Sequence, residues 1–432
     1  MHPRIVVIGA GAAGLLAART LNAAGYHVTV LEATGAIGGR IRTDTDFANF
    51  PVELGAEFIH GSNAITRTLV EESGLSVIPV NRMGNLRWGI PALPLGKLSL
   101  SERKLIVSLQ RDYHALASAP LYGDMSLRDY FAGLGYDSDG LRMADVLLAQ
   151  TCCASLETLS IADLQREMQV DHAGGLAYDG EARIEQGYAE LLRMISRGLT
   201  IRLHSPVSDI QRHGGGLTIY AHGEAHMARA CILTVPVSVL KKDTIRFDPP
   251  LSRAKRDAIH TFRTERATKL IYRFSERLWP DDATYLTGDM DAARWWAPDL
   301  GRGDQAIPVI SCYVTANRAR VFDLMDDYAA LRWGLVQLAE LLGTSQYQLE
   351  RHFVAGKRIS WAHEPYARGG YAHVPPGAAD ARVTLAEPES GGLFFAGEAT
   401  AYDTNPQTVH GAFESGIRAA READAYLRDI VR

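Results

Sequence analysis

The sequence predicts a mixed α/β fold with two domains, in which a parallel sheet begins close to the N-terminus. Two short apolar runs, at 5–8 and 28–31, are separated by a glycine-rich turn and a helical pattern at 12–24. Continuous apolar runs of this length are typical of strands buried on both faces of a parallel sheet. The third observation is length, because 432 residues are too many for one simple core.

The turn between the two strands has the spacing of a dinucleotide-binding loop. Gly9, Gly11 and Gly14 fit the pattern G-x-G-x-x-G. The first glycine permits the tight turn, the second lets the backbone approach a pyrophosphate, and the third lets the helix pack on the strand. The N-terminus of that helix offers free N–H groups to the pyrophosphate. Glu32 ends the second strand, where an acidic side chain can bind ribose hydroxyls.

A second glycine motif helps to distinguish between FAD and NAD as the bound dinucleotide. Gly38 and Gly39 are followed directly by Arg40, which suits a flavin dinucleotide whose phosphates also meet a cation. This pattern resembles flavoprotein oxidoreductases of the glutathione-reductase-like fold. The resemblance implies a Rossmann-like FAD-binding domain of that type and decides for FAD over NAD.

Composition excludes several classes of partner. The formal net charge of −5 gives no electrostatic footprint for nucleic acid. No segment approaches the run of about 20 apolar residues that a membrane span needs. The first strand starts at Ile5 and leaves no room for a signal peptide, so we expect a cytoplasmic protein. We expect no metal site, because the 14 histidines are scattered without ligand spacing.

The remaining elements follow in chain order. Helical spacing predicts helices at 65–73, 98–117, 126–134 and 141–150. Short apolar runs between turn signals predict strands at 201–203, 207–211, 217–221 and 230–235. The pattern then predicts a mixed sheet at 256–305 and 309–315, a helix at 328–342, an aromatic loop at 360–376, a strand at 393–398 and a final helix from 408.

These segments predict two discontinuous domains. The FAD-binding domain comprises residues 1–79, 199–248 and 378–432. The substrate-binding domain comprises a mostly helical insertion at 80–198 and a mixed sheet with helices at 249–377.

Four further segments resemble one family. They are Glu53 to Gly61 (ELGAEFIHG), Arg266 to Phe274 (RATKLIYRF), Ser360 to Tyr371 (SWAHEPYARGGY), and the pair AGEAT at 396–400 and TVHGA at 408–412. Together they are similar to the flavin amine oxidases, which include monoamine oxidases, polyamine oxidases and lysine-specific histone demethylases. The resemblance implies oxidation of a primary or secondary amine, of the polyamine or monoamine type, to an imine. Hydrolysis then gives an aldehyde, and O₂ is reduced to H₂O₂.

The first of these segments implies contacts to both cofactor and substrate. His60 matches the position that faces the substrate amine in polyamine oxidases, although a capping or core histidine is the alternative on sequence alone. Gly55, Ala56, Glu57 and Phe58 are expected beside the flavin, with Phe58 also touching substrate.

The second segment carries the best single catalytic candidate. Strand alternation puts Lys269, Ile271 and Arg273 on one face, so the pattern alone predicts a solvent-facing Lys269. In the family the matching lysine holds a water against flavin N5. The resemblance therefore implies a catalytic Lys269 in an apolar cavity.

The third segment supplies aromatic groups. Trp361 is expected to pack beside the flavin and to contact substrate. Tyr371 is expected to be a catalytic residue and to form one wall of the substrate slot. An aromatic core loop is the alternative. Many family members have a second aromatic where this chain has Thr408, which leaves a wider slot here.

The last segments complete the expected cofactor site. The resemblance implies that Glu398 binds ribityl hydroxyls and that the amides of Thr408 and Val409 face the N1–C2=O edge of the flavin. It also places Ala13 and Val207 among the cofactor contacts. No cysteine follows Cys312, so we expect FAD to be bound non-covalently.

Two other enzymes stay open as alternatives. An L-amino acid oxidase usually has an arginine after the Gly-Ala pair to clamp the substrate carboxylate. Here Glu57 and Phe58 follow instead, although Arg82 or Arg87 could supply a cation from elsewhere. The second alternative is a flavin-dependent desaturase, against which His60 and Lys269 argue. The expected partners are a small amine and O₂, in a monomer or homodimer.

Overall fold

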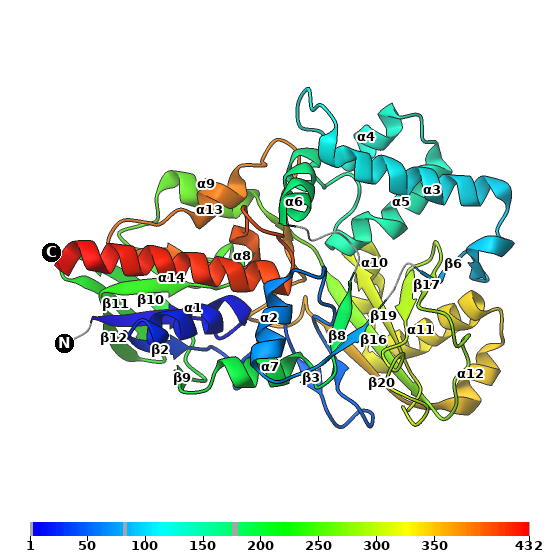
Figure 1. Cartoon of the computed structure of the whole chain (residues 1–432), viewed down its shortest axis with the longest axis horizontal. Helices are drawn as coiled ribbons and strands as arrows, with labels where there is room; N and C mark the ends of the chain where they lie inside the picture. Colours follow the sequence, from blue (N-terminus) through cyan, green and yellow to red (C-terminus); the bar gives the residue numbers. More distant parts are fainter. Residues whose placement is uncertain (1–2, 81–83, 175–179, 432) are drawn as a thin grey trace.

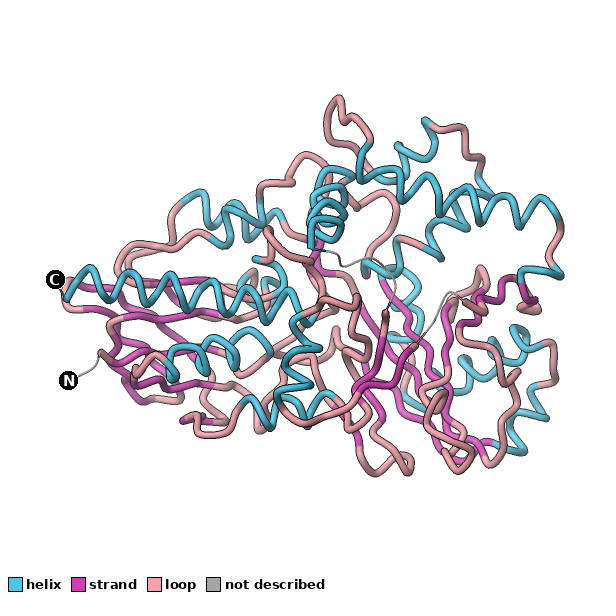
Figure 2. The backbone as a smooth tube through the Cα atoms, in the orientation of Figure 1, coloured by secondary structure: helices cyan, strands magenta, loops and turns pink. Residues whose placement is uncertain are grey.

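The computed structural model describes residues 3–80, 84–174 and 180–431. Its strands gather in two regions, with helices around them (Figure 2). The first region is a parallel sheet in the order β22 (Leu393–Phe395), β13 (Ala230–Leu233), β1 (Arg4–Ile8), β2 (His27–Leu31) and β9 (Thr200–Arg202). The mixed α/β fold class predicted from the sequence is confirmed.

One face of this sheet is covered by helices (Figure 1). They are α1 (Ala12–Ala23), α2 (Ile65–Glu72), α7 (Tyr188–Ile195) and α14 (Val409–Val431). Ile5 and Val7 of β1 face them in a shared apolar core. A Cβ on Gly416 would lie 2.3 Å from the carbonyl oxygen of Ala13, so the backbones of α14 and α1 approach closely.

The other face packs against a second, four-stranded sheet. Its order is β12 (Glu224–Ala228), β11 (Gly216–Ala221), β10 (Val207–His213) and β14 (Arg246–Asp248). Val6, Ile8 and Leu31 point into this layer. The same core continues to α8 (Val237–Leu240), α9 (Arg253–Thr261) and α13 (Ala381–Ala386).

The second region is a seven-stranded mixed sheet. Its order is β20 (Phe353–Ser360), β16 (Ala267–Phe274), β19 (Val309–Thr315), β18 (Arg294–Trp296), β17 (Tyr285–Thr287), β6 (Leu86–Trp88) and β7 (Leu93–Pro94). One face packs on α10 (Ala316–Asp323), α11 (Asp327–Leu342) and α12 (Gln346–His352).

The opposite face lies toward the helical segment at the upper right of Figure 1. This segment contains α3 (Leu100–Ala115), α4 (Leu127–Gly133), α5 (Ser138–Leu147) and α6 (Ile161–Gly174). Trp88, Tyr285 and Trp296 of the sheet share its core. The strand β16, second in this order, packs on the helices with one face and on residues 47–52 and Trp361 with the other, so both of its faces are covered.

Over the described residues, three two-stranded pairs and four 3₁₀ turns complete the fold. The pairs are β3 (Thr43–Asp44) with β4 (Val52–Glu53), β5 (Val77–Pro79) with β8 (Ala182–Ile184), and β15 (Arg263–Thr264) with β21 (Ala372–His373). The 3₁₀ turns are η1 (Leu95–Lys97), η2 (Leu116–Ser118), η3 (Ala149–Cys152) and η4 (Glu398–Thr400). No helix in the described ranges is long and apolar enough to cross a bilayer.

Three segments differ from the sequence expectations, one of them the predicted loop at 360–376, which contains the short strand β21. The insertion at 80–198 contributes the strands β6, β7 and β8, which are only two or three residues long and show no readable period. The helix α9 occupies the start of the segment predicted as mixed sheet, and the Ser252 hydroxyl caps it by accepting from the N–H of Lys255. The predicted domain limits stay a prediction.

The packing of the first turn predicts the effect of one added methyl group. A Cβ on Gly14 would lie 1.9 Å from the carbonyl oxygen of Gly9. We expect Gly14→Ala to lower the free energy of unfolding by about 1–3 kcal/mol and to reduce the flavin content. The matched control is Gly133→Ala, because nothing lies within 4 Å of a Cβ there. Equal stability and flavin content in the two variants would contradict this role of Gly14.

Candidate active site

The predicted dinucleotide-binding loop packs against strand β2 at Gly9 and leaves open space at Gly11. The N–H of Gly9 donates to the carbonyl of Leu31 at 2.8 Å, and Gly9 has a φ of 102°, which favours glycine. A Cβ on Gly11 would meet only the Gly38 carbonyl oxygen, at 3.9 Å. The backbone at Gly11, where α1 begins without a side-chain cap, thus leaves room for a phosphate group.

Glu32 lies at this loop but is already engaged. It is 6% exposed, and its Oε2 accepts from the N–H of Ala10 at 2.8 Å. Its Oε1 accepts from the N–H and the hydroxyl of Thr34 at 2.9 and 2.8 Å. The carboxylate therefore holds the loop in shape, and its contact with ribose stays a prediction.

Arg40 joins the two predicted flavin segments, which lie 358 residues apart in the chain. Its Nη2 donates to Glu398 Oε1 at 3.0 Å, and the N–H of Ala372 donates to the same oxygen at 3.1 Å. Glu398 Oε2 is buried and has no hydrogen-bond partner among the described residues. A small cleft beside it is lined by Arg40, Thr234 and Gly397. An orphan buried oxygen next to a cation and open glycine backbone fits a dinucleotide with its hydroxyls and phosphates.

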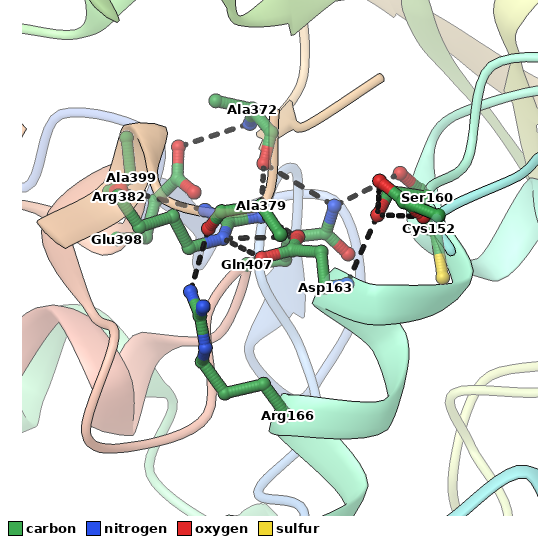
Figure 3. A network of polar contacts seen from close by, with 11 residues as sticks. Cys152, Ser160, Asp163, Arg166, Ala372, Ala379, Arg382, Glu398, Ala399 and Gln407 are labelled. Atoms are coloured by element: carbon green, nitrogen blue, oxygen red, sulfur yellow. Dashed lines mark hydrogen bonds and ion pairs between the residues drawn. The ribbon is translucent and has the colours of Figure 1, made fainter. Parts of the chain in front are cut away.

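The helical segment reaches this site through a buried ion pair (Figure 3). Asp163 of α6 binds Arg382 of α13 with three contacts of 2.9–3.1 Å. Arg382 and Gln407 both donate to the carbonyl of Ala372, at 3.3 and 3.2 Å. Because the N–H of Ala372 binds Glu398, this network holds the Tyr371 loop against the turn before α14.

Glu57 and Lys269 form the buried centre of the site. Both side chains are 2% exposed, and Lys269 Nζ donates to Glu57 Oε2 at 2.7 Å and to the Glu53 carbonyl at 2.6 Å. Glu57 Oε1 accepts from Arg183 Nε at 2.8 Å and from Trp296 Nε1 at 2.9 Å. Burial raises the pKa of Glu57, but the charges of Lys269 and Arg183 lower it further, to below its usual value.

This placement corrects two expectations about Lys269. Strand alternation predicted an exposed side chain, whereas helices cover one face of β16 and loop segments cover the other. An apolar cavity was also expected, but two oxygen atoms accept from the ammonium group, and the Trp296 ring centroid lies 5.2 Å from Nζ. The lysine is thus an immobilised cation. Its role toward a flavin stays a prediction.

Glu53 is the second buried carboxylate here. It accepts from the N–H of Tyr188 and from the hydroxyl of Thr43, each at 2.7 Å. Burial nevertheless raises its pKa to about 7. Near neutral pH Glu53 therefore carries only part of a negative charge.

His60 lies at the exposed side of the same loop. Its side chain is 41% exposed, and Nδ1 lies 2.9 Å from Glu181 Oε1. The Phe58 ring is 6.3 Å away, and it packs edge-on against Trp296 at 5.6 Å. His60 is thus a half-exposed histidine oriented by a carboxylate, rather than a core histidine.

Tyr371 has an aromatic neighbour that the sequence did not identify. Its ring lies 6.5 Å from that of Tyr313 at an angle of 31°, and its hydroxyl donates to the carbonyl of Thr151. Burial raises the pKa of Tyr371, and the charge of Arg294 opposes this in part. Tyr313 therefore adds a second ring beside the predicted wall.

Trp361 contacts the loop at Leu54 and Gly55, which is predicted to lie beside the flavin. It is 4% exposed, its Nε1 donates to the Leu54 carbonyl at 3.3 Å, and a Cβ on Gly55 would lie 2.9 Å from its ring. The N–H of Ala56 donates to the Arg40 carbonyl at 3.3 Å. These contacts place Trp361, Gly55 and Ala56 together, next to Arg40.

The other predicted contacts have mainly local partners. Thr408 caps the first turn of α14, because its hydroxyl accepts from the N–H of Gly411 at 2.9 Å and donates to the Asn405 carbonyl at 2.8 Å. Val409 is the first residue of that helix. Ala13 is buried in α1, and Val207 begins β10 against the core between the sheets. Contacts of these residues with cofactor or substrate stay predictions.

The sequence analysis missed the groups that surround Lys269. Arg183 and Trp296 lie on strands of three residues, where no periodic pattern marks an inward-facing side chain. Of the two arginines considered for a carboxylate clamp, Arg87 is bound by Asp282 at 2.8 Å and Arg82 lies outside the described residues. In the described ranges no cluster of three His, Cys, Asp or Glu side chains could hold a metal ion.

Comparison with known proteins gives concordant results. The family model described as flavin containing amine oxidoreductase matches residues 12–87 and 127–423. Polyamine oxidase 4 of Oryza sativa subsp. japonica is 26% identical over 447 residues, which cover 97% of this chain and 88% of that protein. Lysine-specific histone demethylase 1B of Mus musculus is 28% identical over 452 residues, 98% of this chain but only 53% of the demethylase.

Two solved structures have the same fold. Wild-type putrescine oxidase bound to putrescine superposes with a TM-score of 0.84 at 20% identity, covering 98% of this chain and 99% of that one. Cyclohexylamine oxidase from Brevibacterium oxydans IH-35A superposes with a TM-score of 0.82 at 20% identity, covering 100% of both chains.

The buried pair predicts a large cost for removing one charge. Glu57→Gln leaves the buried cations Lys269 and Arg183 without an anion, so we expect the free energy of unfolding to fall by about 3–5 kcal/mol. The control is Glu72→Gln, because Glu72 pairs with Arg19 at the surface at 3.8 Å and its loss costs at most about 1 kcal/mol. Urea unfolding measures both.

The lowered pKa of Glu57 also determines how the free energy of unfolding changes with pH. Because its folded-state pKa lies below the usual 4.5, Glu57 stabilises the fold above that pH and loses this effect as the pH falls. The acid-induced loss of stability should therefore shrink in Glu57→Gln. Equal unfolding free energies for the Glu57 and Glu72 variants would contradict the central role of the pair.

Proposed function

The chain belongs to the flavin-containing amine oxidoreductases, and we propose that it oxidises a primary or secondary amine, of the polyamine or monoamine type, to an imine. FAD is the proposed cofactor, held without a covalent bond, and O₂ is the proposed acceptor, reduced to H₂O₂. Hydrolysis of the imine gives an aldehyde. When bound, FAD would supply the acceptor for a hydride equivalent from the α-carbon of the amine.

The observation that carries this proposal is that one loop connects the predicted dinucleotide site at Arg40 with the buried Lys269. The Arg40 carbonyl accepts from the N–H of Ala56, and the next residue, Glu57, accepts from Lys269. Arg40 also binds Glu398. One short loop thus sets the cofactor cradle and the buried lysine in a fixed relation, which supports a reaction at the flavin ring next to Lys269.

Lys269 and His60 have separable tasks in this proposal. Lys269 is held by Glu57, so its ammonium group can orient one water molecule toward the cofactor without moving. Glu181 accepts from Nδ1 of His60, which leaves Nε2 as a proton acceptor for a substrate ammonium group. Removal of that proton exposes the nitrogen lone pair that the oxidation requires.

We also propose non-covalent cofactor binding and a cytoplasmic location from the cysteines. All four are buried and free, and burial raises the pKa of Cys152 and Cys153 to about 12. Thiols of this kind are poor nucleophiles and are typical of a reducing compartment. The proposed partners are the amine and O₂ alone, with a monomeric or homodimeric enzyme.

The test uses the purified flavoprotein. We expect denaturation to release FAD, and anaerobic mixing with putrescine, spermidine, phenethylamine or cyclohexylamine, or with amines that carry a carboxylate, to bleach the flavin absorbance. Admission of O₂ should restore the colour and yield equimolar H₂O₂ and aldehyde. Flavin that no amine bleaches, with or without a carboxylate, would refute the proposal, and a flavin that stays with the denatured chain would refute non-covalent binding.

A further inference from the structure

Three arginine residues are buried as whole residues in the described part of the chain, and the buried side chain of a fourth, Arg212, is paired with Glu389. Arg183, Arg294 and Arg382 are 4%, 3% and 1% exposed. Arg183 is paired with Glu57, and Arg382 with Asp163. Arg294 has no carboxylate within 4 Å among the described residues. It is therefore the one buried arginine in these ranges without a counter-charge.

The contacts of Arg294 leave part of its guanidinium group unused. Nε donates to the hydroxyl of Tyr285, and the group lies 5.6 Å from the centroid of that ring. Nη1 is buried and has no hydrogen-bond partner among the described residues. A buried cation with a free donor is strongly unfavourable unless an anion joins it. Tyr285 fixes the orientation of the group but cannot balance its charge.

The sheet register places Arg294 in the candidate active site. Lys269 of β16 pairs with Tyr313 of β19, and the pairing of Trp295 with Cys312 sets Arg294 opposite Tyr313. The three residues thus form one row on one face of three adjacent strands. At about 4.8 Å between strands, the Cα atoms of Lys269 and Arg294 are roughly 10 Å apart. A small substrate spans that distance.

The charges of the site favour an anion in this place. Glu57 is matched by two cations, Lys269 and Arg183, Glu53 carries only part of a charge near neutral pH, and Glu181 is engaged by His60. Arg294 adds a further positive charge. A diamine would bring a second ammonium group into this surplus of positive charge, whereas a carboxylate would neutralise it.

We infer that Arg294 binds a carboxylate on the substrate, so that the enzyme oxidises amines that carry a carboxylate group. The inference rests on the proposed amine oxidation and narrows its substrate class. A planar guanidinium group matches a carboxylate in shape and charge. The carboxylate lies either on the α-carbon of the amine, as in an α-amino acid, or at the far end of the chain, as in an ω-amino acid.

Matched substrate pairs test this inference on the complete enzyme. The α-carboxylate arm compares L-phenylalanine with phenethylamine and L-lysine with cadaverine, and the ω-carboxylate arm compares 5-aminopentanoate with pentylamine. Anaerobic flavin reduction, followed against concentration, gives the dissociation constant of each. In one arm we expect the acid to bind roughly tenfold to a hundredfold more tightly than its partner. Amines that bind as tightly as their acids in both arms would overturn the inference.

Variants then assign the preference to Arg294. Arg294→Met should bring the ratio of the two dissociation constants close to one, and Arg294→Lys should leave an intermediate ratio. The control is Arg320→Met, because Arg320 is exposed on α10 and should keep the wild-type ratio. An unchanged preference in Arg294→Met, or in Arg294→Lys should the first variant lose its flavin, would overturn the inference.

Failure of the proposed oxidation is distinguishable from failure of this inference. If no amine reduces the flavin, the oxidation is refuted. The same acids are then titrated into the oxidised protein, and the shift of the flavin absorbance is compared between wild type and the Arg294 variants. A shift that depends on Arg294 supports carboxylate binding at this site, and equal shifts or none refute it.

Discussion

The buried carboxylate of Glu57 is the group on which the candidate site depends. It accepts from Lys269 on β16, Arg183 on β8 and Trp296 on β18, so one side chain joins two sheets. Removing Glu57 alone leaves two buried cations, Lys269 and Arg183, without this anion, so the arrangement depends on the carboxylate. In the proposed reaction, this arrangement keeps Lys269 in position while substrate and product exchange.

The same loop connects this centre with the dinucleotide side. Arg40 contacts Ala56 through its carbonyl and Glu398 through its guanidinium group, and the second carboxylate oxygen of Glu398 has no partner within the described part of the chain. From the other direction, the pair of Asp163 and Arg382 holds the Tyr371 loop by way of Ala372 (Figure 3). The predicted cofactor site at Arg40 and Glu398, the buried Lys269 and the Tyr371 loop are thus connected by one network of polar contacts.

The features that were predicted correctly from the sequence are those that depend on neighbouring residues in the chain. The turn at Gly9 to Gly14 follows from the space that glycine leaves, and such constraints are readable from spacing alone. The burial of Lys269 was not readable from its strand, because the groups that cover it, the loop from Glu53 to Glu57 and the ring of Trp296, come from elsewhere in the chain. Tyr313 and Arg294 were missed for a related reason, since their position in one row with Lys269 depends on the pairing of strands distant in sequence.

The most direct test of the central role of Lys269 is a stopped-flow comparison of Lys269→Met with wild type, in which anaerobic reduction and reoxidation by O₂ are measured separately. The account predicts that the variant retains its flavin and that one of the two steps slows by about a hundredfold or more, as for the loss of a group that positions a proton or water. Rates equal to wild type in both steps, at equal flavin content, would contradict it.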